Sequence, residues 1–376
     1  MHESINPRFI IKISAGIEIM NKVAVIISPN YENYAQRYLK DCLESLRRQD
    51  WAGELKIFIT DNRSTAESFA FLKETAPEVE IIRNKNNDGF AKGNNDAMQL
   101  ALRGGYDYLI LLNIDTIVET DCISHLVRAA ESDGAIGAVQ ARVMLWPEKN
   151  KINSLGNVTH FLGFGYCDGY REEWSGHSFP NIRDICFPSG AAALYKKEVL
   201  ERTGLFDEEF RIYNEDQDLG WRIWLAGWRC VLAPQAVVYH KYEFSGNSRK
   251  YYWLDRNRTL TIIKNYQPAT LLLISPAFIF MEIGLLLFAL QKGWFRDKLK
   301  VYKYFLRRKN WQYIVRARCK SQALRRVKDQ DIIGMFSGRI WYDEVGDWKL
   351  CLANQILNIY WYVIKWIMIM KPGAIR

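Results

Sequence analysis

"YDYLILLNIDTIVETD", residues 106–121, contains an apolar run that stops abruptly at polar residues. The apolar residues 109–112 predict a strand buried on both faces, as in a parallel sheet. Asp115 follows three residues later. Ligands of open parallel sheets bind at the carboxyl ends of the strands, so Asp115 is a candidate to hold a metal ion or a substrate. A carboxylate that only caps the next helix fits the same position.

Three further strand-like runs precede this one, and helical patterns separate them. The strands are expected at 23–27, 55–60, 79–84 and 109–112, and the helices at 36–49, 67–77 and 90–105. This alternation predicts an α/β fold with a Rossmann-like, mostly parallel sheet flanked by helices. Beyond residue 140 we expect a helix with a glycine stop within 196–210, another helix at 216–228, and two strands within 230–240 that Pro234 interrupts.

Composition limits the class of protein. The chain has 376 residues, of which 49% are hydrophobic, enough for two domains or for one domain with a large appendage. Its seven cysteines include no CxxC pair, which favours reduced thiols in a cytosolic setting over a disulfide framework or a zinc ribbon. We divide the chain into an extension (1–20), an α/β domain (21–245) and a C-terminal helical region (246–376). An extra edge strand is the alternative for 1–20.

The C-terminal region has the composition of a membrane-associating segment. Residues 269–290 are apolar and long enough to span a bilayer, yet they include Pro276 and Glu282, and a carboxylate is costly in lipid. A second apolar stretch lies at 356–370. We expect association with an anionic membrane surface through amphipathic or re-entrant helices. A true span and a soluble helical cap are the alternatives.

The positive charge of the chain is concentrated in one segment. Residues 292–328 contain fourteen Lys and Arg against Asp297 alone, which gives this segment +13 and leaves −4 of the total +9 for the rest of the chain. Aromatic residues are interleaved with these cations, a pattern that also suits single-stranded nucleic acid. Because the apolar stretch 269–290 adjoins the segment, we expect lipid and not nucleic acid as the partner.

Polar residues follow each of the four predicted strands. Since the carboxyl ends of parallel strands share one edge of a sheet, these residues should gather where a nucleotide would bind. The candidates for binding a nucleotide sugar are Pro29, Asn30, Tyr31, Asp61, Asn62, Asn94, Asn95, Asn113 and Asp115.

Several of these stretches resemble glycosyltransferase family 2, which has the GT-A fold, in its rhamnosyltransferase-like branch. The matching stretches are "VAVIISPNYENYAQRYLKDCLESL" (23–46), "NNDGFAKGNN" (86–95), Asn113-Ile114-Asp115 and "LFDEEFRIYNEDQDLGWR" (205–222). The resemblance covers about residues 22 to 245, and the last of these stretches is the most specific.

The resemblance implies roles in binding the donor. Asp61 would accept a hydrogen bond from the imide N–H of uracil or thymine, and Asn94 and Asn95 would contact the nucleotide near a helix N-terminus. Asp115 would bind Mg²⁺ or Mn²⁺ together with the diphosphate. Asn113 stands where the family has its first metal-binding Asp, so one charge is lost. His240 falls where a further metal ligand is common, although a structural His fits that position too.

The resemblance also implies the catalytic residues. Asp216 would be the base that takes the proton from the acceptor hydroxyl in an inverting transfer, with Glu215 and Asp218 orienting the acceptor or neighbouring groups. Acidic residues that only favour a helix N-terminus are the alternative. Ser189-Gly190-Ala191 would flank the sugar pocket. Arg256 and Arg258 are left open between contacts to phosphate and surface ion pairs.

The expected function is therefore an inverting glycosyltransferase in cell-surface glycan assembly. It would move a sugar from a dTDP- or UDP-sugar, with dTDP-rhamnose as the branch-level expectation, to a hydroxyl of a polyprenyl-diphosphate-linked saccharide. It would work at the cytoplasmic face of the cell membrane, either peripherally or with one or two inserted helices. A polyprenyl-phosphate sugar synthase and a catalytically inactive nucleotide-sugar-binding scaffold are the alternatives. A sugar-1-phosphate nucleotidyltransferase is disfavoured because "ISPNYENY" lacks glycine.

Overall fold

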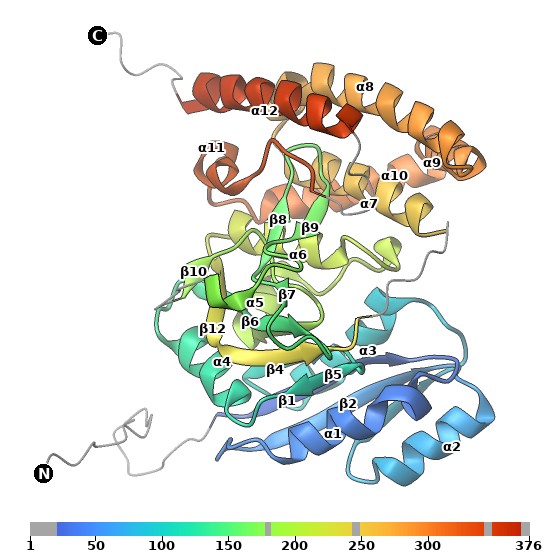
Figure 1. Cartoon of the computed structure of the whole chain (residues 1–376), viewed down its shortest axis with the longest axis vertical. Helices are drawn as coiled ribbons and strands as arrows, with labels where there is room; N and C mark the ends of the chain where they lie inside the picture. Colours follow the sequence, from blue (N-terminus) through green and yellow to red (C-terminus); the bar gives the residue numbers. More distant parts are fainter. Residues whose placement is uncertain (1–20, 177–181, 243–248, 342–347, 370–376) are drawn as a thin grey trace, which may run out of the picture.

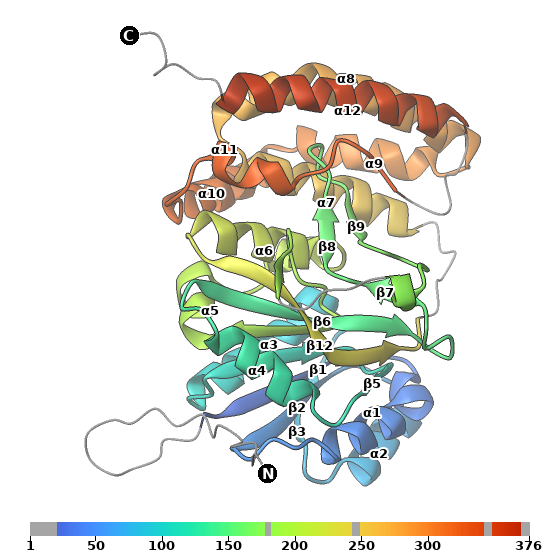
Figure 2. The same cartoon turned by 60° about the vertical axis from the view of Figure 1, so that its left-hand side comes forward.

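The computed structural model describes residues 21–176, 182–242, 249–341 and 348–369, and the extension 1–20 lies outside them. Figures 1 and 2 show a central sheet with helices on both faces and a layer of helices stacked on one end. The α/β, GT-A-type architecture expected from the sequence is confirmed, including the helical C-terminal region.

The main sheet is mixed. Its spatial order is β10-β12-β6-β11-β4-β1-β2-β3, while β5 pairs with β12 and β7 with β6. The pairs β4–β1, β1–β2, β2–β3 and β6–β12 are parallel, and β11 runs antiparallel to β4 and β6. The strands are β1 (Val23–Asn30), β2 (Leu55–Asn62), β3 (Glu80–Asn84), β4 (Tyr108–Leu112), β5 (Thr116–Val118), β6 (Ile136–Leu145), β7 (Ile152–Ser154), β10 (Arg183–Asp184), β11 (Ala192–Lys196) and β12 (Arg229–His240).

The four strands predicted first are parallel neighbours, so their carboxyl ends do meet at one edge. Side chains of β1 alternate between the two faces: Val23 and Val25 pack with α1, α2 and α4, whereas Ala24 and Ile26 pack with α3, α5 and α6. A small separate sheet consists of β8 (Asn157–Thr159) and β9 (Gly165–Cys167). The helices are α1 (Lys40–Arg47), preceded by a π-helical turn (Ala35–Leu39), α2 (Ala66–Thr75), α3 (Phe90–Arg103), α4 (Cys122–Glu131), α5 (Lys197–Thr203) and α6 (Glu215–Leu225).

The glycine stop predicted within 196–210 is confirmed: the helix ends at Thr203, because Gly204 takes a φ of +77°. A second predicted element differs in the structure. The strand pair expected within 230–240 is one strand, β12, which pairs with β6 on both sides of Pro234. Its register shifts between Ala233 and Val237, and this bulge accommodates a proline that has no N–H to donate.

The C-terminal helices share a core with the sheet domain. Trp361 stacks on Phe161 with ring centroids 4.7 Å apart, and Trp221 packs edge-on against Tyr266 at 4.7 Å. In both views α8 and α12 form the outermost layer, with α7, α9 and α10 between them and the sheet (Figures 1 and 2). These helices are α7 (Arg249–Asn265), α8 (Pro268–Gln291), α9 (Phe295–Leu306), α10 (Arg308–Ala323), α11 (Asp329–Ile332) and α12 (Trp348–Ile369).

A buried cluster of charges joins α7, α8 and α9. Lys298 contacts Asp255 at 2.7 Å and Glu282 at 2.6 Å, and Arg258 contacts both carboxylates. Although burial raises it, Arg258 and Lys298 together hold the pKa of Glu282 below its usual value. The carboxylate that seemed misplaced in an apolar stretch is therefore paired inside the protein.

This cluster corrects two predictions. Arg258 is 1% exposed and Arg256 is 3% exposed, so neither forms a surface ion pair or is placed to meet phosphate. Arg256 instead donates to the carbonyl of Glu209 and to the side chain of Asn257. Lys298, counted above among the cations of the basic segment, is fully buried.

Candidate active site

The turn after β4 presents the carboxylate of Asp115 at the edge of the sheet. The backbone N–H of Asn113 donates to Ala191 at 3.0 Å, and the N–H of Lys241 donates to the Asp115 carbonyl at 2.8 Å. The Thr116 hydroxyl donates to the Asn113 carbonyl at 2.7 Å. These bonds fix the turn, and both Asn113 and Asp115 keep partly exposed side chains.

His240, at the end of β12, faces this turn. Its Nε2 lies 3.2 Å from Oδ1 of Asp115 and 3.4 Å from Nδ2 of Asn113, while its Nδ1 lies 2.9 Å from Oδ1 of Asn153 on β7. An amide oxygen only accepts, so Nδ1 carries a hydrogen, and in the neutral imidazole Nε2 presents its lone pair to the Asp115 carboxylate. A cation between these two groups would stabilise that arrangement.

These residues fit a divalent metal. A carboxylate oxygen of Asp115 and the Nε2 nitrogen of His240 lie 3.2 Å apart, and Nδ2 of Asn113 lies 3.4 Å from the same nitrogen. The Oδ1 atom of Asn113 is buried without a hydrogen-bond partner. Within the described residues no three His, Cys, Asp or Glu side chains form a complete metal cluster. Mg²⁺ and Mn²⁺ sites that hold phosphate need only one or two carboxylates, because the phosphates supply oxygen ligands.

At the tips of β1 and β2, only Asp61 keeps a polar atom free. Its Oδ1 accepts from Nδ2 of Asn30 at 2.9 Å, while Oδ2 has no hydrogen-bond partner and lies 3.8 Å from Nε of Arg83. Asn30 also accepts from the N–H of Ala35. Asn62 accepts from Nδ2 of Asn84 and donates to the carbonyl of Gly89. Asp61 is fully buried, so a base could reach its free oxygen only if a neighbouring group moved.

The other residues predicted to contact the donor are partly exposed, buried without a partner, or bonded to the backbone. Tyr31 is partly exposed and stacks on Tyr34 at 4.3 Å, and burial, Tyr34 and the charge of Asp115 all raise its pKa. Asn94 has a buried Oδ1 without a partner. Nδ2 and Oδ1 of Asn95 both bond the backbone of Phe206, at 2.9 and 3.1 Å. Asn95 therefore ties α3 to the loop that follows α5.

Pro29 contributes packing. It is buried and touches α3 at Gly93, where a Cβ would lie 2.3 Å from Cγ of Pro29. Only glycine therefore fits at this position of "NNDGFAKGNN", and the close approach brings α3 against the tip of β1.

Asp216 and Glu215 begin α6 after a strained loop. Arg211, Tyr213 and Asn214 all have φ between 62° and 68°, a left-handed conformation that is uncommon for these residue types and often marks functional sites. Nδ2 of Asn257 holds this loop by donating to the carbonyls of Phe210, Ile212 and Tyr213 at 2.7–2.9 Å.

The two acids have raised pKa values. Burial raises the pKa of Asp216 to about 6, even though the N–H groups of Gln217 and Gly190 donate to its carboxylate. Burial and the charge of Asp216 raise the pKa of Glu215 well above its usual value. Glu215 is 5% exposed with an unpartnered Oε2, whereas Asp216 is only partly buried. Asp216 is therefore the accessible carboxylate, with a pKa suited to a base near neutral pH.

The segment 189–191 connects Asp216 to the turn after β4. The N–H of Gly190 lies 3.3 Å from the Asp216 carboxylate, and the carbonyl of Ala191 accepts from Asn113. Segment 189–191 therefore bonds both to Asp216 and to the turn that carries Asp115, which His240 faces.

Asp218 does not face this site. It is fully buried and bonds Arg222 at 2.9 Å, Lys264 at 2.9 Å and Asn265 at 3.1 Å. Of the two expectations, its contacts fit the orienting of neighbouring groups and not of the acceptor, because its side chain points into the contact between α6 and α7. Asn153 and Asn257, which position His240 and the loop before Asp216, were not predicted, since neither lies in a motif that signals such a role.

Comparison with known proteins gives one family and several distant relatives. The model of the family described as Glycosyl transferase family 2 matches residues 25–204, a range that includes Asp115 but not Asp216 or His240. An N-acetylglucosaminyl-diphospho-decaprenol L-rhamnosyltransferase of Mycobacterium tuberculosis is 26% identical over 250 residues, covering 61% of this chain and 78% of the relative. An N-acetylglucosaminyltransferase of Mesorhizobium japonicum is 27% identical, covering 57% of this chain and 50% of the relative.

Among solved structures, GalNAc-T7 with UDP, GalNAc and Mn²⁺ has a TM-score of 0.52. Its sequence identity is 14%, and the match covers 67% of this chain and 49% of that protein, so the likeness concerns the fold alone. The chain thus spans about half the length of the Mesorhizobium japonicum relative and of GalNAc-T7.

Proposed function

We propose that this chain, whose residues 25–204 match the model of glycosyltransferase family 2, transfers a sugar, with inversion, from a nucleotide-diphosphate sugar to a hydroxyl of a lipid-linked saccharide. The observation that supports this proposal is that segment 189–191 bonds both the Asp216 carboxylate and the turn that carries Asp115, which His240 faces. A site of this kind can hold a diphosphate at one end and deprotonate an acceptor at the other.

In the reaction, the Asp216 carboxylate takes the proton of the acceptor hydroxyl. The acceptor oxygen then forms a bond to the anomeric carbon, and the bond from that carbon to the diphosphate breaks on the opposite face, which inverts the configuration. Asp115 and His240 would hold Mg²⁺ or Mn²⁺, which supplies positive charge to the leaving diphosphate. Neutral Glu215, beside the base, would donate a hydrogen bond and orient the acceptor.

The donor is proposed to be a dTDP- or UDP-sugar. Oδ2 of Asp61, which has no hydrogen-bond partner, suits the imide N–H that uracil and thymine share, once a neighbouring group moves to expose it. A solved structure with a similar fold contains UDP and Mn²⁺, and the relative in Mycobacterium tuberculosis is named as a rhamnosyltransferase. These names support a pyrimidine nucleotide sugar, with dTDP-rhamnose as one candidate.

The acceptor is proposed to be a saccharide on a polyprenyl diphosphate, reached from the cytoplasmic face of the cell membrane. The named substrate of the Mycobacterium tuberculosis relative is such a lipid. Among the described residues, α8 alone has the length and apolar composition of a membrane-crossing helix. These observations support work at a membrane.

Donor hydrolysis by the purified, detergent-solubilised protein tests the function. UDP-, dTDP- and GDP-sugars are compared with Mn²⁺, with Mg²⁺ and with EDTA. We expect release of one nucleotide that EDTA abolishes, and Asp115→Ala should weaken Mn²⁺ binding in the presence of that nucleotide by roughly 100-fold, because a charged ligand is lost. Binding of no nucleotide in calorimetry would overturn the proposal in favour of an inactive scaffold.

Asn153 offers a second test of the metal site. Asn153→Leu removes the acceptor that fixes the His240 tautomer, so Mn²⁺ affinity, titrated calorimetrically with nucleotide present, should fall about tenfold. Asn153→Asp keeps an acceptor oxygen and serves as the matched control, with a smaller loss expected. Equal affinities of Asn153→Leu and the wild type would show that His240 does not bind the metal.

A further inference from the structure

Exposed apolar residues gather on the two outermost helices. Among the described residues, eighteen of the twenty-one large hydrophobic residues that are exposed lie between 272 and 369. A contiguous apolar surface of this size marks an interaction site, whereas scattered exposed residues do not. The thirteen on α8 and α12, which we call the apolar face, are Leu272, Ile279, Phe280, Ile283, Leu287, Leu290, Leu352, Ile356, Ile359, Tyr362, Val363, Trp366 and Ile369.

The apolar face points away from the body of the protein. The opposite sides of both helices pack into one core, to which Ile274 and Met281 belong on α8 and Leu357 and Trp361 on α12. The Tyr360 hydroxyl also donates to the Leu273 carbonyl at 2.6 Å, which joins the two helices directly. Both views place them side by side at the end of the molecule farthest from β1–β3 (Figures 1 and 2).

The inner side of α8 is bonded to the protein along its length. Near its start, the Thr270 hydroxyl donates to Asp329 at 2.6 Å, and toward its end Glu282 pairs with Arg258 and Lys298. A helix that crosses a bilayer must leave the protein surface over about 30 Å. Crossing would separate Glu282 from its two cations and place its charge in lipid, which is costly.

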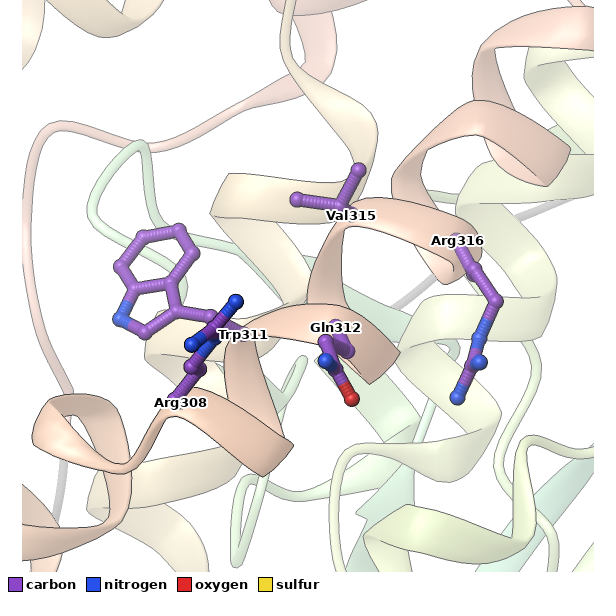
Figure 3. Close-up of a pocket in the computed structure, with 5 residues that line it drawn as sticks. All are labelled: Arg308, Trp311, Gln312, Val315 and Arg316. Carbon is purple, nitrogen blue, oxygen red and sulfur yellow. The ribbon is translucent and has the colours of Figure 1, made fainter.

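Positive charge borders the apolar face. Of the fourteen cations between 292 and 328, eleven are exposed, and they lie on or beside α9 and α10 directly after α8. One face of α10 combines Arg308 and Arg316 with Trp311 and Val315 around an open hollow of about 550 Å³ (Figure 3). Guanidinium groups beside aromatic and aliphatic side chains suit the headgroup layer of an anionic bilayer.

We propose that the apolar face lies flat in an anionic bilayer surface, with α8 parallel to the membrane plane and the cations of α9 and α10 on the lipid headgroups. This inference rests on the proposed function for its need to reach a lipid-linked acceptor, and it adds how the enzyme sits there. A second copy of the chain fits the face less well, because pairing would bring two +13 segments together.

Contacts of two neighbouring residues on α7 link the apolar face to the loop before Asp216. Asn257 of α7 holds the loop before Asp216, and Arg258, the next residue, belongs to the charged cluster that holds α8. Through α7, the helix α8 of the apolar face is therefore linked to the loop that positions the proposed base. This link suits an enzyme whose acceptor is embedded in the bilayer.

Depth measurements test the orientation. The full chain, with Cys319 and Cys351 replaced by Ser, carries a fluorescent label on a single introduced Cys in place of Leu272, Ile283 or Leu290. It is reconstituted with equal parts phosphatidylcholine and phosphatidylglycerol, and quenching by shallow and deep nitroxide lipids is measured. Leu272 and Leu290 are about 27 Å apart along α8. We expect equal, shallow depths at all three positions; a graded depth along α8 would overturn the proposal in favour of a span.

A matched pair of variants tests the face itself. Ile283→Asp/Leu287→Asp should weaken vesicle binding at least tenfold, roughly the effect of removing two large apolar side chains from the interface. Ala70→Asp/Gln99→Asp adds the same charge on exposed positions of α2 and α3 and should bind like the wild type. Absence of vesicle binding by the wild type overturns the proposal, and a concentration-dependent dimer that shields the labels would assign the face to a second copy.

Donor hydrolysis measured on the same samples separates the two proposals. A protein that hydrolyses its donor without binding vesicles refutes the membrane orientation alone. A protein that binds vesicles flat but binds no nucleotide refutes the proposed function alone.

Discussion

Asp216→Asn should reduce sugar transfer by about 10³-fold while leaving nucleotide binding intact. The asparagine amide is nearly the same size as the carboxylate but cannot take the acceptor proton, and a positioned general base contributes about 10² to 10⁴ in rate. Gly190 and Gln217 now donate to different oxygens of Asp216, so the amide oxygen of an asparagine can keep one of these bonds, the shorter being that from Gln217 at 2.8 Å. Initial rates of transfer at saturating acceptor, with nucleotide affinity from calorimetry, measure the two effects.

Asp133→Asn is the matched control, because Asp133 is exposed and pairs only at the surface with Arg229. It should transfer sugar at the wild-type rate. If Asp216→Asn kept a tenth or more of that rate, another group would have to be the base and Asp216 would be a helix-terminal acid.

The pH profile gives an independent check of the same residue. Burial raises the pKa of Asp216 to about 6, so the carboxylate is protonated and unable to act as a base below that pH. The transfer rate of the wild type should therefore rise as pH increases through about 6 and then level off. Asp216→Asn should lose this rise, whereas Asp133→Asn should keep it.

The positions of the sheet and of its polar tips could be predicted because they follow from local pattern. Buried runs such as 109–112 predict parallel strands, and parallel neighbours necessarily bring their carboxyl ends to one edge. This reasoning placed Asp61 and Asp115 at that edge. It could not say that Asn30 would bond Asp61, or that Asn95 would bond the backbone of Phe206, 111 residues away. Such pairings depend on tertiary contacts that no local pattern encodes.

The second half of the site depended on resemblance and on partners distant in sequence. His240 follows a strand that the sequence divided in two, and Asn153, which fixes its tautomer, lies 87 residues earlier. Arg258 was left open between phosphate contacts and surface pairs because its partner Glu282 is on another helix. In the sequence alone, Glu282 is an unpaired carboxylate in an apolar stretch, whereas in the structure it pairs with Arg258 and Lys298. The sequence showed that a charge was out of place, but only the fold shows what neutralises it.

Lys298→Met should destabilise the protein by about 3–5 kcal/mol, the usual cost of removing one partner from a buried ion pair. Lys298 is fully buried, and its loss leaves the carboxylates of Asp255 and Glu282 facing Arg258 alone. In thermal unfolding of the detergent-solubilised protein this corresponds to a fall of roughly 4–6 °C in the midpoint. The sequence-neighbouring Lys300→Met is the matched control: Lys300 is 66% exposed in its side chain, so its loss should change stability by less than about 0.5 kcal/mol.

A double variant separates charge imbalance from loss of packing. Lys298→Met/Glu282→Gln leaves Arg258 and Asp255 as a balanced pair, and because the lost charges were partners it should be more stable than Lys298→Met alone. If Lys298→Met cost under 1 kcal/mol, water would reach the cluster and α8 would be held by apolar packing only. In that case the argument that Glu282 keeps α8 out of the bilayer would fail as well, since a carboxylate that tolerates the loss of its cation is not bound tightly enough to fix the helix against the protein.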